Sequence, residues 1–382
     1  MAAVCWTSVM PFTPVYLGEM GVATNVEFWA GLIGAVGSAG TMVMAPVWGA
    51  IGDRFGRRLG MLRAAIFLMM GYALMALVET PLELLLVRLI IGVLTGFVPM
   101  AVALIGVSTP REQIGPALGL VQTAWPAGNL LGPMLGGAIA DWLGLRAAMW
   151  ASAVILGTIS LCVYLLVREQ FTPPPKEQNR MFRDLQHAAS YPVLIPIILV
   201  SSVSMASFGV LDPVLVPFVK GLLGADSPSW LAGFLYSVPG VAFVLTAPWW
   251  ARRGERIGFH KTVAAGLLVS GLLYLPTTFV TGPWQFGLLR VAIGVAGAAI
   301  GPGVATMLAT AVPRELRGRA FGLNQSAASA GAVVGPLMGG AVASFLGQRG
   351  VFILTAGILL AGYLWVTRVL TPRLLDARAS GD

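Results

Sequence analysis

The sequence predicts an all-α polytopic membrane protein with twelve transmembrane helices in two pseudo-symmetric six-helix bundles. The first observation is composition: 57% of the 382 residues are hydrophobic and 10% are charged, with a mean hydropathy of +0.83. Soluble domains carry about a quarter charged residues, so this chain lacks the material for a solvated surface. The second observation is an alternation of basic and nearly uncharged loops, and the third is an internal repeat of about half the chain.

Twelve apolar segments are separated by clusters of glycine, proline and charged residues. A bilayer-spanning helix needs about 20 apolar residues, and open sheets cannot satisfy their backbone in lipid. We therefore expect an N-terminal six-helix bundle at 1–167, a cytoplasmic linker at 168–190, a C-terminal bundle at 191–370 and a cytoplasmic tail at 371–382. Because the first segment is short, we expect the natural chain to begin upstream of Met1. The segments are 2–20, 27–51, 59–78, 82–107, 116–140, 145–167, 191–219, 229–251, 260–280, 284–311, 318–343 and 348–370.

The net charge of +8 follows the topology of these segments. Of the 24 Lys and Arg residues, 19 fall in alternate connections: 52–63, 108–115, 168–190, 252–261, 313–319 and the residues after Val366. Cytoplasmic loops carry such an excess under the positive-inside rule. Both termini are therefore expected in the cytoplasm of a multi-pass cell-membrane protein, and the basic charge does not indicate nucleic-acid binding.

Four stretches of the first half recur in the second half at an offset of 202 or 203 residues. The longest, "AGNLLGPMLGGAIADWLG" at 127–144, returns as "AGAVVGPLMGGAVASFLG" at 330–347. "STPREQIGPALGL" returns as "AVPRELRGRAFGL", "PVWGAIGDRFG" as "PWWARRGERIG", and "LVRLIIG" as "LLRVAIG". Two parallel six-helix halves around a midplane site are typical of secondary transporters.

The repeated stretch is rich in glycine, which lets membrane helices approach closely where lipid gives no hydrophobic drive. We expect these two helices, the fifth and the eleventh, to pack the moving halves against each other, with ordinary membrane packing as the alternative. The motif consists of Gly128, Gly132, Pro133, Gly136 and Gly137, repeated at Gly335 and Pro336.

Three motifs carry a family resemblance. "GAIGDRFGRRLG" at 49–60 resembles the loop between helices 2 and 3 of the major facilitator superfamily, and "LVRLIIGVLTG" at 86–96 resembles its helix-4 motif. "GNLLGPMLGG" at 128–137 is similar to the helix-5 motif of the proton-coupled antiporters. The pattern covers almost the whole chain and is similar to the MdtG-like group of twelve-helix drug:proton antiporters. The resemblance implies the major facilitator fold, although helix 1 has no acidic residue before Glu19.

Charged residues inside the apolar segments are the candidates for proton coupling, since charge within a membrane span is costly. Arg88 and Arg290 lie roughly 8–10 Å from the outer ends of their helices, and Asp212 lies about 12 Å from its outer end. By resemblance, these helices line a central cavity. Asp212 is the embedded group that could exchange a proton near neutral pH. For Asp212 the alternative is a static ion pair or an Asp-Pro helix break. For the arginines the alternative is that their donors form hydrogen bonds that join the backbones of neighbouring helices.

The loop motif implies, by resemblance, a conformational latch on the cytoplasmic side. Its glycines permit a tight turn, and an acid can accept hydrogen bonds from a facing helix N-terminus, here the start of helix 11. The alternative is a solvated positive-inside loop. The latch residues are Gly52, Asp53, Arg54, Gly56, Arg57 and Arg58.

An aromatic, partly polar cavity is the expected substrate site, because small-ligand sites combine apolar walls with a few polar groups. Packing against lipid or a neighbouring helix is the alternative for each residue. The candidates are Tyr16, Phe97, Trp125, Phe208, Phe218, Tyr236 and Gln325.

The sequence contains no catalytic constellation. Both histidines, His187 and His260, fall in loops, so neither a metal site nor a cofactor is expected inside the membrane. A phosphate loop of the G-x-x-x-x-G-K-[ST] kind is also missing, which argues against ATP-driven transport. We expect a monomeric, proton-coupled exporter of small drug-like molecules. A proton symporter on the same fold and a non-transporting receptor are the alternatives.

Overall fold

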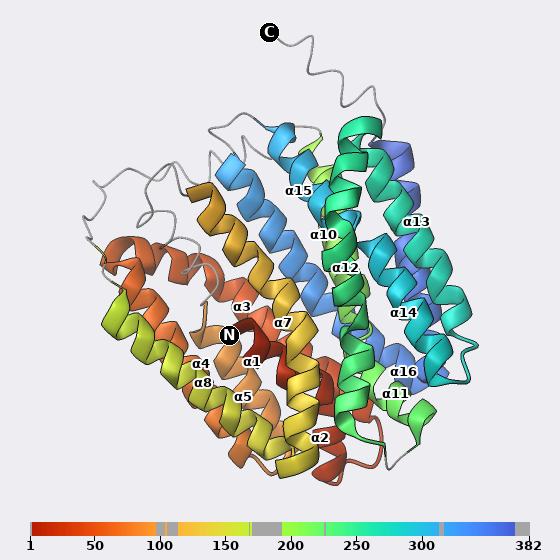
Figure 1. Cartoon of the computed structure of the whole chain (residues 1–382). Helices are drawn as coiled ribbons and strands as arrows, with labels where there is room; N and C mark the ends of the chain where they lie inside the picture. Colours follow the sequence, from red (N-terminus) through yellow and green to blue (C-terminus); the bar gives the residue numbers. More distant parts are fainter. Residues whose placement is uncertain are drawn as a thin grey trace. The chain divides into compact units, whose positions relative to one another are not determined.

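The computed structural model describes residues 2–96, 104, 114–167, 169, 193–224, 227–312 and 317–370. All regular structure in these residues is helical (Figure 1). The chain forms two compact units, which are described separately below.

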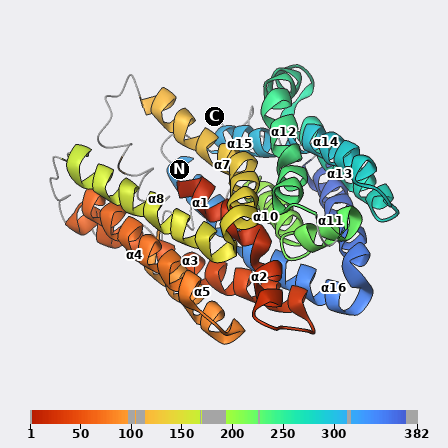
Figure 2. The same cartoon turned by 60° about the horizontal axis from the view of Figure 1, so that its bottom comes forward.

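The first unit contains residues Met1–Lys176 and Leu215–Ser237. In it α1 packs against α7, α3 against α5, and α4 against α8; α4 and α8 run side by side in both views (Figures 1 and 2). Its helices are α1 (Ala2–Val9), η1 (Met10–Phe12), α2 (Thr13–Glu19), α3 (Val26–Phe55), α4 (Arg57–Leu77), α5 (Pro81–Leu94), α7 (Ile114–Leu143), α8 (Leu145–Leu166), α11 (Leu215–Leu223) and the start of α12 (Ser229–Ile257).

The second unit contains residues Glu177–Val214 and Val238–Asp382. In it α16 packs against both α10 and α13, and α13 also contacts α14 and α15. Segment 215–237 thus groups with the first unit, whereas the sequence alone places it in the second bundle. The helices of the second unit are α10 (Leu194–Gly209), the rest of α12, α13 (Phe259–Thr277), α14 (Pro283–Gly297), α15 (Ile300–Ala311) and α16 (Arg317–Val369).

Six described stretches are long and apolar enough to cross a membrane. The last one, Ala320–Val369, contains two spans because α16 leaves helical geometry at Gly347. Shorter apolar helices, including Leu130–Leu143 and Leu194–Gly209, belong to further spans. The first and seventh predicted spans are each interrupted: η1 separates α1 from α2, and a turn at 210–214 separates α10 from α11. Pro11 and Pro213 lie in these two breaks at the repeat offset of 202, and a proline removes a helical hydrogen bond.

Glycines with left-handed backbone geometry join consecutive antiparallel helices at repeated positions. Gly56 (φ 100°) separates α3 from α4, and Gly258 (φ 95°) separates α12 from α13. Gly144 (φ 87°) and Gly347 (φ 73°) form the second repeated pair. A residue with a Cβ rarely adopts these angles, so the repeat preserves the residue type that each turn requires.

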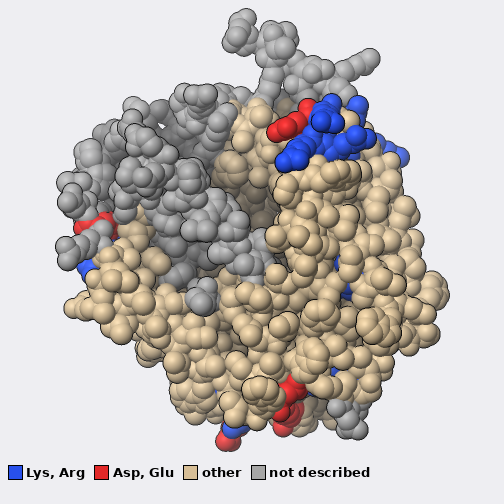
Figure 3. Space-filling view, viewed as in Figure 1, with Lys and Arg blue, Asp and Glu red and all other residues tan. Residues whose placement is uncertain are grey.

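Exposed basic side chains of the second unit form a group at a helix junction. These residues gather where α12 ends and α13 begins, above a flank that is mostly uncharged (Figure 3). Trp142 is exposed near the C-terminal end of α7, and Trp284 is exposed near the N-terminal end of α14. Aromatic residues are expected at helix ends that lie at a membrane interface. The basic group consists of Arg252, Arg253, Arg256 and Lys261.

Candidate functional site

Arg88 is fully enclosed in the first unit. Its side chain is 1% exposed, and its Nη2 donates to Sδ of Met10 in η1. The guanidinium lies 5.3 Å from the Trp6 ring and also interacts with the Tyr72 side chain of α4. Arg88 thus joins the break in the first span to the third and fourth spans.

Arg290 occupies the equivalent position in the second unit. It is the eighth residue of α14, as Arg88 is of α5, and each helix begins with a proline. Its side chain is 7% exposed, interacts with Tyr274 of α13, and lies 6.0 Å from the Phe286 ring. Tyr72 and Tyr274 are themselves 202 residues apart. A buried arginine with a tyrosine partner is therefore present in both units.

Small residues let the helix that carries Arg88 approach its neighbour. A Cβ on Gly40 of α3 would lie 2.9 Å from the backbone nitrogen of Val93, and a Cβ on Gly92 would overlap the backbone of Gly37. In the second unit a Cβ on Gly294 would lie 2.7 Å from Cα of Pro239. Gly92 and Gly294 are equivalent in the repeat, so both arginines lie beside close backbone contacts.

Asp212 is half-buried in the turn that interrupts the seventh span. Its N–H donates to the carbonyl of Gly209 at 3.2 Å, in the short-range pattern that replaces regular helix bonds here. The repeat makes Asp212 equivalent to Met10, the residue that contacts Arg88. A carboxylate thus stands in the second unit where the first unit has a thioether.

The glycine motif of α7 packs mainly against the first span. Cβ atoms on Gly128, Gly132 and Gly136 would lie within 2.9 Å of Ala3, Val4 and Ser8, and Thr7 Oγ1 donates to the Gly128 carbonyl at 2.6 Å. The repeated motif in the sequence predicts that this surface packs against the other half. For these three glycines that prediction is wrong, because α1 fills the space.

The outer end of the same motif contacts α12. A Cβ on Gly137 would lie 2.5 Å from the Ser229 carbonyl, and one on Gly233 would lie 2.6 Å from the carbonyl carbon of Pro133. Asp141, one helical turn further along α7, accepts hydrogen bonds from the N–H groups of Ser229 (2.7 Å) and Trp230 (2.9 Å). Asp141 thus caps the first turn of α12, a role that sequence reasoning missed.

In the second unit the matching motif packs against α10. A Cβ on Gly335 would lie 2.5 Å from the Ala206 carbonyl, and one on Gly209 would lie 2.8 Å from Cδ of Pro336. Val4 and Ala206, the contacts of Gly132 and Gly335, are again equivalent in the repeat. The same packing contact is therefore made once in each half.

The latch residues have contacts within the first unit. Glu169, which follows α8, accepts from the N–H groups of Arg57 (3.1 Å) and Arg58 (2.8 Å) at the start of α4. Arg58 Nη2 also donates to the Tyr164 carbonyl at 2.6 Å. Gly52 is buried and Arg54 is exposed, 5.3 Å from the Phe55 ring. The Asp53 side chain and the side chains that begin α16 lie outside the described part of the chain.

The predicted cavity residues are not brought together by the described contacts. Tyr16 is 1% exposed, and its hydroxyl donates to the carbonyls of Met75 (3.1 Å) and Val78 (3.2 Å) at the end of α4. Tyr16 is therefore reassigned from the substrate cavity to a packing role, in which its hydroxyl joins α2 to the end of α4. Phe218 is buried and Tyr236 half-buried, whereas Phe208 (54%) and Gln325 are exposed. Phe97 and the Trp125 side chain lie outside the described residues.

The family model of the Major Facilitator Superfamily matches residues 1–229 and 197–381. The chain belongs to the major facilitator superfamily. It is 36% identical to the multidrug resistance protein MdtG of Citrobacter koseri over 96% of this chain and 91% of that protein. It is 35% identical to MdtG of Salmonella typhimurium over 96% and 92%.

Solved structures of other transporters share the fold. The nucleoside transporter NupG matches with a TM-score of 0.79 and 12% identity over 97% of this chain and 98% of that one. The human organic anion transporter MFSD10 matches with a TM-score of 0.70 and 20% identity over 96% of both chains. As a member of this superfamily, the chain is a multi-pass, twelve-helix secondary transporter of small molecules and not an enzyme.

Proposed function

We propose that this transporter exports small drug-like or amphiphilic molecules in exchange for protons, by alternating access. The name of its MdtG relatives, multidrug resistance protein, supports the class of cargo. The helix-5 motif supports antiport over symport, and the glycine packing described above explains why that motif is made of small residues.

The observation that carries proton coupling is the equivalence of Met10 and Asp212. Arg88 Nη2 donates to Met10 Sδ in the first unit, and the repeat offset supports an equivalent pairing of the Asp212 carboxylate with Arg290 in the second unit. A carboxylate can exchange a proton at working pH, whereas a thioether cannot. Asp212 is therefore the proton carrier, Arg290 its counter-charge, and Arg88 a fixed charge in a non-titrating copy of the site.

This charge set favours certain substrates. Two arginines and one aspartate give a net charge of about +1, which becomes about +2 when Asp212 is protonated. Placing a like charge in a low-dielectric site costs several kcal/mol. Neutral, zwitterionic and anionic amphiphiles are thus preferred over dications.

The remaining assignments complete the proposal. Asp53 acts with the loop 52–58 as the cytoplasmic latch. Residues 1–167 and 191–370 move as the two halves around linker 168–190, with both termini on the cytoplasmic side of the cell membrane. The working unit is a monomer, which contains both arginines and Asp212.

The direct test is flux into inverted membrane vesicles whose interior is acidified. The antiporter accumulates a radiolabelled neutral amphiphile, and a proton ionophore abolishes this accumulation. A symporter expels substrate under the same gradient, so net expulsion would favour uptake over export.

A further inference from the structure

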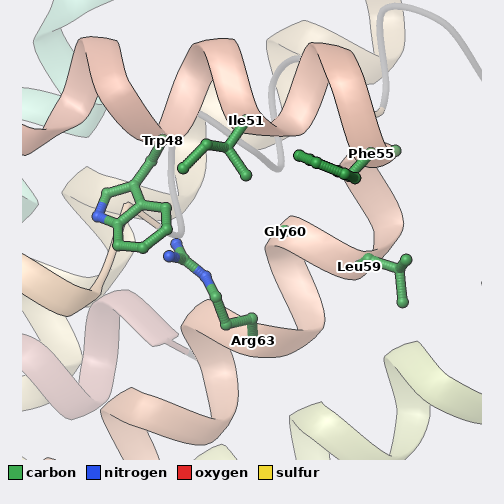
Figure 4. A pocket seen from close by; sticks show the side chains of 7 residues that line it. Trp48, Ile51, Phe55, Leu59, Gly60 and Arg63 are labelled. Carbon is green, nitrogen blue, oxygen red and sulfur yellow. The ribbon is translucent and has the colours of Figure 1, made fainter. Parts of the chain in front are cut away.

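A pocket of about 310 Å³ opens between α3 and α4, near the loop that joins them. Trp48, Ile51 and Phe55 line it from α3, and Leu59, Gly60 and Arg63 line it from α4 (Figure 4). Phe55 and Leu59 are 59% and 60% exposed at its mouth. In a membrane protein, apolar side chains exposed where a span ends meet the lipid interface, so this mouth suits the acyl chain of a lipid.

Arg63 is the charged group inside the pocket. Its guanidinium carbon lies 3.1 Å from the centroid of the Trp48 ring, and its Nη2 donates to the Thr95 carbonyl at 3.2 Å. Its Nε and Nη1 are buried and have no hydrogen-bond partner among the described residues. A buried donor without a partner costs free energy, and more so when it is charged. An acceptor that entered the pocket and reached these two N–H groups would give them the partners they lack.

The second half of the chain provides an internal comparison. Trp48 Nε1 donates to the Val93 carbonyl at 2.7 Å, and its equivalent Trp250 donates to the Val295 carbonyl at 2.7 Å. The tryptophan bond is thus common to both halves and holds helices together.

Arg63 and two of the apolar lining residues belong to the first half alone. At the positions equivalent to Arg63, Leu59 and Ile51, the second half has Ala265, Lys261 and Arg253. Packing common to both halves therefore does not account for Arg63.

We propose that this pocket binds a phospholipid with a net negative headgroup. The headgroup phosphate accepts from Arg63, and an acyl chain lies along Ile51, Phe55 and Leu59. The basic residues Arg54, Arg57 and Arg58 at the adjacent junction of α3 and α4 add attraction for an anionic headgroup over a zwitterionic one. This site does not depend on the proposed proton coupling, because it rests on the lipid-facing surface and on Arg63.

The test is native mass spectrometry of the purified full chain with phosphatidylglycerol or phosphatidylcholine added. One arginine near a membrane surface changes anionic-lipid binding about fivefold. We expect the wild type to retain phosphatidylglycerol at least about fivefold better, and Arg63→Gln to lose that preference. Arg253→Gln, which removes an exposed arginine near the end of α12 at the Ile51-equivalent position, should keep it.

Arg63→Lys provides a second variant that keeps the charge if Arg63→Gln fails to fold. We expect an intermediate preference, because lysine supplies a charge without the planar fork that stacks on Trp48. Equal retention of both lipids by the wild type would overturn the proposal. So would equal losses in Arg63→Gln and Arg253→Gln, or displacement of the lipid by millimolar inorganic phosphate, which would indicate a free-anion site.

Discussion

At the residue scale, a substitution at Tyr16 distinguishes a role in helix packing from a role in substrate binding. The Tyr16 hydroxyl donates to two carbonyls at the end of α4, so Tyr16→Phe removes these bonds and keeps the ring. A hydrogen bond of this kind contributes about 0.5–1.5 kcal/mol, and often less in a membrane. We expect a thermal midpoint lower by a few degrees in detergent, with the transport rate unchanged.

Tyr164→Phe is the matched control, because the Tyr164 side chain is exposed on α8 and Arg58 contacts its ring and carbonyl rather than its hydroxyl. It should change neither quantity. If Tyr16→Phe lost transport while its thermal midpoint stayed unchanged, Tyr16 would belong to the substrate site and not to helix packing.

Residue types alone identified the embedded charges but not their partners. Arg88 and Arg290 stand out because charge is rare in apolar segments, and the repeat offset is enough to pair them. The contact of Arg88 with Met10 was not predictable, since a thioether has no charge pattern to reveal it. Asp141 and Glu169 were also missed: each lies at a helix end and caps a helix that is distant in sequence.

At the element scale, Gly132 tests the packing of α7 on α1. A Cβ at this position would overlap Thr7 Oγ1 and lie 2.8 Å from the Val4 carbonyl, so Gly132→Ala forces the two helices apart. Overpacking of this kind costs about 1–3 kcal/mol. We expect a lower thermal midpoint and less monodisperse protein on size-exclusion chromatography.

Gly357→Ala in α16 is the control, since a Cβ there meets nothing within 4 Å. Alanine favours a helix over glycine by about 0.8–1 kcal/mol, so this variant should be neutral or more stable. An equally stable Gly132→Ala protein would show that α1 and α7 do not pack as described.

Asp141 tests the link between α7 and the first turn of α12. Asp141→Ala removes the acceptor for the Ser229 and Trp230 N–H groups, and a lost N-cap costs about 0.5–2 kcal/mol. Hydrogen exchange should accelerate in the first turn of α12. Glu255→Ala, at the other end of the same helix, should leave hydrogen exchange in that turn unchanged. If Asp141→Ala did not alter the exchange either, Asp141 would not cap α12.

At the scale of the whole molecule, the repeat extends to details within the helices. The twin breaks at Pro11 and Pro213, and the glycine junctions at Gly56 and Gly258, lie at repeated residues of the sequence, although only the tight turn of the first loop was predicted from the sequence. The direction in which each glycine face points was not predictable, because a stripe of small residues fits any close neighbour. The grouping of 215–237 with the first unit depends on contacts of α11 with α2 and η1, which no local pattern encodes.

The central claim is that Asp212 couples proton movement to export, and Asp212→Asn tests it in inverted vesicles. The variant should lose concentrative accumulation of a neutral amphiphile under an imposed proton gradient. It should still exchange labelled for unlabelled substrate, because exchange needs binding and rocking but no proton. Asp212→Glu, which keeps the carboxylate, should restore part of the accumulation. Proton-driven accumulation by Asp212→Asn at wild-type levels would contradict the account and place the coupling group elsewhere.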